Sequence, residues 1–143
     1  MKLSTNTEMF IHKNQKEVFD TIHIPEKLIA FFSSYSSTLN KTDYGYYWKV
    51  SPNKSHMVKI RLLIPSEKNE IQFEWEFSGE TTLVEINIEP VSSNTCLIKV
   101  TETGWEKDSV GLEKYNRQMK VWSYFVIRLK LYLEHGLNLQ PKQ

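Results

Sequence analysis

Residues 112–133 read LEKYNRQMKVWSYFVIRLKLYL, and apolar side chains recur in this stretch at steps of three and four residues. That spacing places the apolar side chains on one face of an α-helix. Ser109 can cap the start of such a helix, and Gly136 can end it. A helix of about 26 residues would be about 39 Å long, enough to cross a whole sheet. The stripe, which needs an apolar partner surface, consists of Leu112, Tyr115, Met119, Trp122, Val126, Leu129 and Leu133.

The residues before this helix alternate between apolar and polar with a period of two, as half-buried strands do. Turn-forming residues separate the alternating runs, which is typical of an antiparallel sheet with one solvent-exposed face. We therefore expect an α+β fold of helix-grip type, in which a curved antiparallel sheet wraps one long C-terminal helix. The expected strands cover residues 3–11, 44–50, 58–64, 71–77, 84–88 and 96–100.

Two short helices are expected between the first strand and the second. Asn14 is a suitable N-cap for the first helix, because Glu17 follows three residues later as in a capping box. Pro25 suits the first turn of the second helix. Residues 33–43 are polar and are expected to form a loop. The apolar side chains expected to face the core from the two helices are Val18, Phe19, Ile22, Leu28, Ile29, Phe31 and Phe32.

Length and composition are those of one globular domain. The chain has 143 residues, of which 40% are hydrophobic and 24% charged, so we expect a single domain over residues 1–143 with a frayed tail at 137–143. The net charge is only +1 and the basic residues are scattered, which argues against nucleic-acid binding. The N-terminal residues lack the apolar segment of a signal peptide, and no run of about 20 apolar residues could span a membrane. A cytoplasmic protein is the resulting expectation.

No sequence motif for catalysis, cofactor binding or metal binding is found, so neither a cofactor nor a metal is expected. The single cysteine, Cys96, is interpreted as a small core residue, with a reactive thiol as the alternative. Glu74 and Glu76 share the polar face of one strand and are interpreted as solvated side chains, because a catalytic pair would have to be buried. The histidines, interpreted as surface residues, are His12, His23, His56 and His135.

Four stretches of the chain resemble a known family. They are KNQKEVFDTI with PEKL at 13–28, IQFEWEF at 71–77, VTETGW at 100–105 and LYLEHG at 131–136. With the order of the expected elements, they resemble the START-like superfamily, also called SRPBCC or pollen-allergen-like. Within it, the chain looks most like bacterial homologues of the Aha-type activator of the heat-shock chaperone ATPase. The resemblance to the superfamily implies a helix-grip fold with a cavity between the sheet and the final helix. The resemblance to the chaperone activators implies a role in the stress response.

Aromatic residues make up 13% of the chain, and many of them can point into the space between the sheet and the long helix. They either fill a core or wall an incompletely filled cavity, and the resemblance to START-like proteins implies the cavity. Apolar pockets with a few polar groups are the usual form of small-molecule sites. The predicted ligand-binding residues are Tyr46, Trp48, Phe73, Trp75, Glu102, Tyr115 and Trp122, and Phe77 and Trp105 can face the same space.

Glu102 is the polar member of this set. Counted from Ile98 and Val100, its position in the strand points it inward, unless the strand twists and leaves it solvated. An inward carboxylate must be paired, hydrated or protonated. Hydroxyl groups that could pair with it belong to Tyr44, Tyr46 and Tyr115.

Two classes of function follow. The first is a non-catalytic binding module that holds a small apolar or aromatic ligand between the sheet and the C-terminal helix. The alternative is a protein-interaction domain, co-chaperone-like, with a chaperone or another protein as partner and a vestigial cavity. An enzyme acting on a hydrophobic substrate is a third alternative, but the sequence places no acid–base pair for it.

Overall fold

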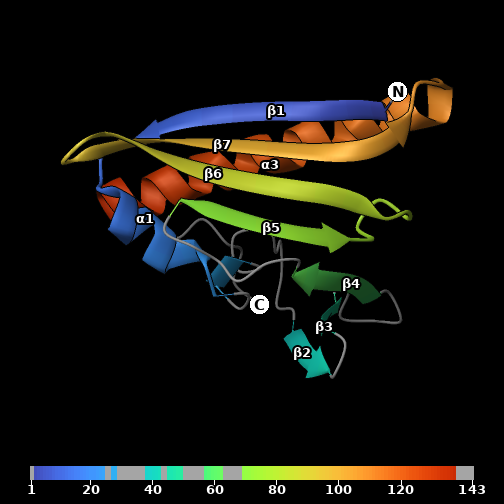
Figure 1. Cartoon of the computed structure of the whole chain (residues 1–143), viewed down its shortest axis with the longest axis horizontal. Coiled ribbons are helices and arrows are strands. Elements are labelled where there is room, and N and C mark those ends of the chain that lie inside the picture. Colours follow the sequence, from blue (N-terminus) through green and yellow to red (C-terminus); the bar gives the residue numbers. More distant parts are fainter. Residues whose placement is uncertain are drawn as a thin grey trace.

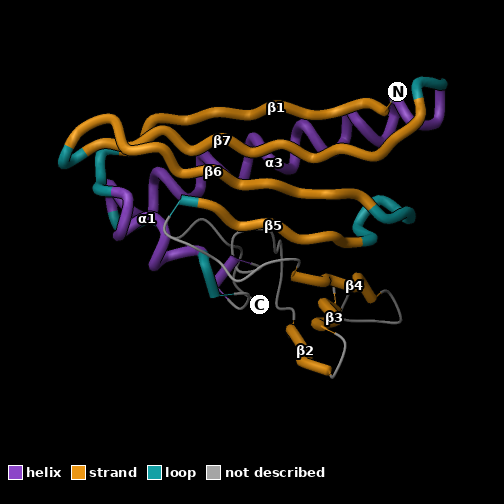
Figure 2. Tube along the Cα trace, in the orientation of Figure 1, coloured by secondary structure: helices purple, strands orange, loops and turns teal. Residues whose placement is uncertain are grey.

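A computed structural model describes residues 2–24, 27–28, 38–42, 45–49, 57–62 and 69–137 (Figure 1). Within residues 38–42 and 45–49, and at Met57 and Leu62, only the backbone is described. The described residues form two helices and seven strands, in the α+β arrangement that the sequence predicts (Figure 2). The helices are α1 (Gln15–Ile22) and α3 (Ser109–His135). The strands are β1 (Lys2–Ile11), β2 (Thr38–Thr42), β3 (Gly45–Lys49), β4 (Met57–Leu62), β5 (Glu70–Trp75), β6 (Thr82–Ser92) and β7 (Thr95–Glu106).

The strands form one antiparallel sheet in the order β1-β7-β6-β5-β4-β3-β2. The first strand therefore lies beside the last, and the sheet does not close into a barrel. Figure 1 shows the long strands β1, β7, β6 and β5 side by side, with α3 running behind them. Among the described elements, α3 lies along β1 and β7, and α1 lies next to β6.

The alternating runs predicted to be strands bury one face. In β5, Ile71, Phe73 and Trp75 are buried, while Gln72 and Glu74 between them are half-buried. The prediction of a loop over residues 33–43 is wrong in part, because β2 forms there and pairs with β3. The sequence of β2, TLNKT, has no apolar alternation to reveal it. An edge strand is held by backbone hydrogen bonds to one neighbour, and a hydrophobic pattern does not report these.

The short helix α1 starts as predicted. The Asn14 side chain caps it, accepting a hydrogen bond from the backbone N–H of Glu17 at 2.8 Å. Of the second short helix, the structure describes only residues 27–28, where Leu28 is buried as expected. The other residues predicted for that helix, and most of the predicted tail at 137–143, lie outside the described residues.

The long helix confirms the predicted length and end, but its start and its buried face differ from the prediction. Its N-cap is Asp108, whose side chain accepts from the backbone N–H of Gly111 at 2.8 Å, and not Ser109. A Cβ atom on Gly111 would lie 1.9 Å from the backbone oxygen of Glu106, so the helix start is pressed against the end of β7. This contact turns Gly111 inward and Leu112 outward, where 50% of Leu112 is exposed. The buried residues of α3 are Gly111, Gln118, Trp122, Phe125, Val126 and Leu129.

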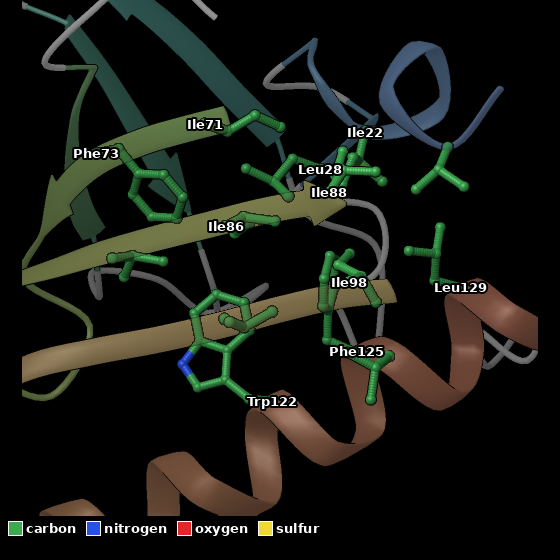
Figure 3. Packing of buried hydrophobic residues seen from close by; sticks show 14 of the residues in the cluster. Ile22, Leu28, Ile71, Phe73, Ile86, Ile88, Ile98, Trp122, Phe125 and Leu129 are labelled. Atoms are coloured by element: carbon green, nitrogen blue, oxygen red, sulfur yellow. The ribbon is translucent and has the colours of Figure 1, made fainter. Parts of the chain in front are cut away.

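The core lies between the sheet and the helices (Figure 3). Branched aliphatic residues of β5, β6 and β7 line its sheet side, and the rings of Trp122 and Phe125 enter it from α3. Ile22 and Leu28 close one end of the core near Ile88. Within the described ranges, neither helix is both long and apolar enough to cross a membrane.

Candidate functional site

A buried carboxylate joins three strands to the long helix. Glu102 of β7 is 0% exposed, and its Oε2 accepts hydrogen bonds from Trp75 Nε1 at 2.8 Å and Thr82 Oγ1 at 2.5 Å. Its Oε1 accepts from Gln118 Nε2 at 2.9 Å and from Trp122 Nε1 at 2.8 Å. We call these five residues, Trp75, Thr82, Glu102, Gln118 and Trp122, the Glu102 cluster.

The register of the sheet brings the strand members of the cluster together. Glu102 pairs with Val84 of β6, and Thr82 lies two residues from Val84 on the same face of that strand. Trp75 of β5 is directly opposite Thr82. Direct and diagonal neighbours on one face of a sheet are within reach of long side chains. The three side chains therefore converge on one point of the inner face.

The helical members converge because they lie one turn apart. Gln118 and Trp122 are separated by four residues, so both occupy the face of α3 that points at the sheet. Each donates one N–H to the same carboxylate oxygen. Glu102 thus fixes the middle of α3 against the sheet.

The four donors match the capacity of an ionised carboxylate, which has about four lone-pair positions. An indole N–H can only donate, so Trp75 and Trp122 both require an acceptor. The backbone N–H of Glu102 is also used, because it donates to Thr5 Oγ1 at 3.0 Å. In the described ranges, Glu102 forms no ion pair with a lysine, arginine or histidine. Among the described side chains, hydrogen bonds alone therefore compensate its burial.

A bulge in β7 shapes the strand next to the cluster. Gly104 is the extra residue at the point where the pairing with β1 shifts register, and its φ is +151°. A Cβ there would lie 3.0 Å from the side chain and 3.2 Å from the Cα of Thr82. The bulge turns Trp105 inward, where its Nε1 donates to Ser78 Oγ at 3.0 Å. Trp105 is therefore buried but does not bond to Glu102.

Aromatic rings connect the cluster from the sheet to the helix. The Trp75 ring stacks on Phe77 at 4.9 Å and meets the edge of Phe73 at 5.3 Å, between ring centroids. The ring centroids of Trp75 and Trp122 lie 5.7 Å apart. The Phe125 ring makes an edge-to-face contact with Trp122, at 5.4 Å between centroids. Figure 3 shows Trp122 rising from α3 towards the strands, with its ring nitrogen turned away from Phe125. The result is a run of rings with a hydrogen-bonded carboxylate beside it.

The structure brings together four of the predicted ligand-binding residues and separates a fifth. Phe73, Trp75, Glu102 and Trp122 meet as described, and all four are buried. Tyr115 is half-buried and contacts Trp105 at 6.4 Å between ring centroids. Its hydroxyl is not among the hydrogen-bond donors to Glu102.

The other predicted residues lie where side chains are not described. Tyr46 and Trp48 are in β3, where their backbones pair with Ile60 and Val58 of β4. Tyr44, which was expected to offer a hydroxyl to Glu102, lies outside the described residues.

Sequence reasoning missed two members of the cluster, Thr82 and Gln118. Gln118 is one helical turn before Trp122, so its position on the inner face was available from spacing. Thr82 shares the parity of Val84 and Ile86 and was equally available. Both side chains are polar, and an apolar pattern does not report a polar residue on an inner face.

Among the described residues, the remaining titratable side chains do not form a second site. His12 is exposed, and the half-buried His23 stacks on Phe19 at 4.7 Å between ring centroids. Cys96 is buried in the core, and burial raises the pKa of its thiol. Glu74 pairs with Arg61 at 2.8 Å on the outer face of the sheet. No group of three or more His, Cys, Asp or Glu side chains in the described part of the chain is placed to hold a metal ion.

Comparison with known proteins gives the fold and no closer relationship. Neither protein-family models nor curated proteins match the chain significantly. Among solved structures, SSP2350 from Staphylococcus saprophyticus matches with 22% identity and a TM-score of 0.67, over 99% of this chain and 98% of that one. XoxI from Bacillus cereus matches with 20% identity and a TM-score of 0.71, over 92% of this chain and 98% of that one.

A third solved structure is DynU16, described as a putative protein in the dynemicin biosynthetic locus. It matches with 15% identity and a TM-score of 0.73, over 98% of this chain and 51% of that one. At these identities the likeness establishes the fold alone. The chain has the helix-grip fold, with a curved antiparallel sheet against a long C-terminal helix.

Proposed function

We propose that the protein is a non-catalytic binding module that holds a small apolar or aromatic ligand between the sheet and α3. The observation that carries the proposal is the run of rings from Phe77 through Trp75 to Trp122 beside the Glu102 carboxylate. Small-molecule sites combine apolar and aromatic walls with a few placed polar groups. The Glu102 cluster supplies that combination at the helix–sheet interface.

Ligand entry requires the rings to separate, because Phe73, Trp75 and Trp122 are almost fully buried against one another. The packing of α3 supports a separation on one side. Its backbone lies along β1 and β7, whereas β5 meets α3 through the contact of Trp75 with Trp122. Movement of β5 away from α3 would separate Trp75 from Trp122 and from Glu102, and would leave the contacts of α3 with β1 and β7 in place. An apolar ligand that fills the opened space would gain about 25 cal/mol for each Å² of apolar surface buried.

The proposal is tested with N-phenyl-1-naphthylamine, an apolar probe that fluoresces when it leaves water. We expect saturable binding with a dissociation constant on the order of 100 µM or below. Binding should also produce energy transfer from tryptophan to the probe. Phe73→Leu should weaken the binding, because it removes a ring that contacts Trp75. Glu74→Gln is the matched control, since Glu74 neighbours Phe73 in the same strand but faces outward. A non-saturable response, or equal effects of the two substitutions, would count against the proposal.

A second candidate function is protein interaction, as the resemblance to Aha-type activators implies. The observation that favours it is the outward face of α3, where Tyr124 is 62% exposed and Ile127 and Tyr132 are also exposed. Arg128 lies 5.8 Å from the centre of the Tyr124 ring. Large exposed side chains of this kind are typical of protein-binding surfaces. The test is the ATPase rate of a bacterial heat-shock chaperone with and without the protein, and with the Tyr124→Ser variant. An unchanged rate would exclude the activator role.

A further inference from the structure

One polar atom of the Glu102 cluster is buried without a partner. Gln118 is 1% exposed, and its Nε2 donates to Glu102 at 2.9 Å. Its Oε1 has no hydrogen-bond partner among the residues that the structure describes. A buried carbonyl oxygen is almost always paired, so an unpaired one requires an explanation.

The orientation of the Gln118 amide is fixed by its neighbour. Turning the amide over would place Oε1 against the Glu102 carboxylate, so that two acceptors faced each other without a proton. The other donors of the cluster are already used. The indole N–H groups of Trp75 and Trp122 and the hydroxyl of Thr82 all point at Glu102. No donor of the cluster is therefore left for Gln118 Oε1, and a molecule that enters the site could supply one.

We propose that Gln118 Oε1 recognises a hydrogen-bond donor, a hydroxyl or N–H group, on an otherwise apolar aromatic ligand. This inference rests on the proposed binding function and names the class of ligand. Glu102 has no acceptor position left, so it is a positioning residue that orients the Gln118 amide and does not itself bind the ligand. Its negative charge also disfavours an anionic ligand at this place.

Two probes of matched shape test the inference, namely 2-naphthol and 2-methylnaphthalene, with dissociation constants measured by tryptophan fluorescence of the full chain. A methyl group leaves water more readily than a hydroxyl, so 2-methylnaphthalene binds more tightly wherever no hydrogen bond forms. We expect the opposite order, with 2-naphthol about tenfold tighter, because an unmet buried acceptor penalises the methyl probe.

The substitution Gln118→Leu removes the acceptor and should reverse the order of the two probes. Thr7→Val is the matched control, since Thr7 Oγ1 is the other buried side-chain oxygen without a partner among the described residues, and Thr7 is not part of the Glu102 cluster. This control should keep the preference for 2-naphthol.

The outcomes separate the two proposals. If both probes bind the unsubstituted chain but 2-methylnaphthalene binds more tightly, Gln118 Oε1 is served by a buried water only and the inference is wrong. A preference for 2-naphthol that survives Gln118→Leu would also overturn it, by placing recognition elsewhere. If neither probe binds, the proposed function fails and the inference with it. If Gln118→Leu does not fold, the comparison of probes on the unsubstituted chain still overturns the inference when 2-methylnaphthalene binds more tightly.

Discussion

Replacing Glu102 should destabilise the fold in proportion to the number of buried donors that lose their acceptor. In Glu102→Leu, all four donors lose it, since leucine has a similar volume but no acceptor. The donors are the indoles of Trp75 and Trp122, the Thr82 hydroxyl and the Gln118 amide. A buried polar group without a partner costs about 1–3 kcal/mol. Four of them would cost at least about 4 kcal/mol, which is much of the stability of an ordinary domain.

Glu102→Gln should be milder. The introduced amide keeps one acceptor oxygen, and its NH2 group can donate to the Thr82 hydroxyl or, after rotation, to Gln118 Oε1. In either arrangement one indole N–H has no acceptor, because an indole cannot accept from the amide. We therefore expect a loss of about 1–3 kcal/mol in the free energy of unfolding.

The assay is chemical denaturation followed by far-ultraviolet circular dichroism, which does not depend on the tryptophans. Glu85→Gln is the control for loss of charge, because Glu85 is half-buried on the outer face and accepts from Gln72 at 2.9 Å. It should change the stability by less than about 0.5 kcal/mol. Some buried charges can be replaced by apolar residues of similar volume without loss. A Glu102→Leu variant as stable as the unsubstituted chain would refute the role given to the hydrogen bonds.

Three further predictions concern the packing and the charge pairs of α3. Trp122→Ala should lower the free energy of unfolding by about 3–5 kcal/mol, measured by denaturation, and a loss below about 1 kcal/mol would contradict its place in the core. Gly111→Ala should shift the start of α3 and destabilise the fold by more than about 1 kcal/mol, because its Cβ would overlap the end of β7. Burial opposes ionisation of Glu134, but bonds from the His12 backbone and Lys130 outweigh it and lower the pKa of Glu134. The stability contributed by Glu134 should thus be present above its unfolded pKa and be lost as the pH falls through the lower folded pKa. In denaturation experiments, Glu134→Gln should therefore be less stable than the unsubstituted chain at neutral pH and equally stable in strong acid.

The parts of the fold that the sequence predicts are those with a strong hydrophobic period. The alternation in residues 71–77 predicts β5 and its buried face, and the apolar spacing after Gly104 predicts the long helix. The hydrophobic period alone does not show which side of the helix faces the sheet near its start. There, the contact of Gly111 with the end of β7 decides which side faces the sheet, and Leu112 is turned out.

The candidate site is also predictable only in part, because its contacts depend on how separate segments pack together. The parity of Glu102 with Val100 predicts that it points inward, because parity depends on the strand alone. Its partners depend on the register between strands and on how α3 lies against them, which no single segment encodes. The expected hydroxyl partners were therefore wrong for Tyr115, while Thr82 and Gln118 were missed.

The most direct measurement is a two-dimensional ¹H–¹⁵N NMR titration of the full chain with N-phenyl-1-naphthylamine, observing the indole N–H signals. Trp75 and Trp122 donate to Glu102 within the proposed site, whereas Trp105 donates to Ser78 outside the cluster. A ligand between the sheet and α3 should shift the signals of Trp75 and Trp122 saturably and leave that of Trp105 nearly unchanged. Signals of Trp75 and Trp122 that do not move, or that move no more than that of Trp105, would contradict binding at this place.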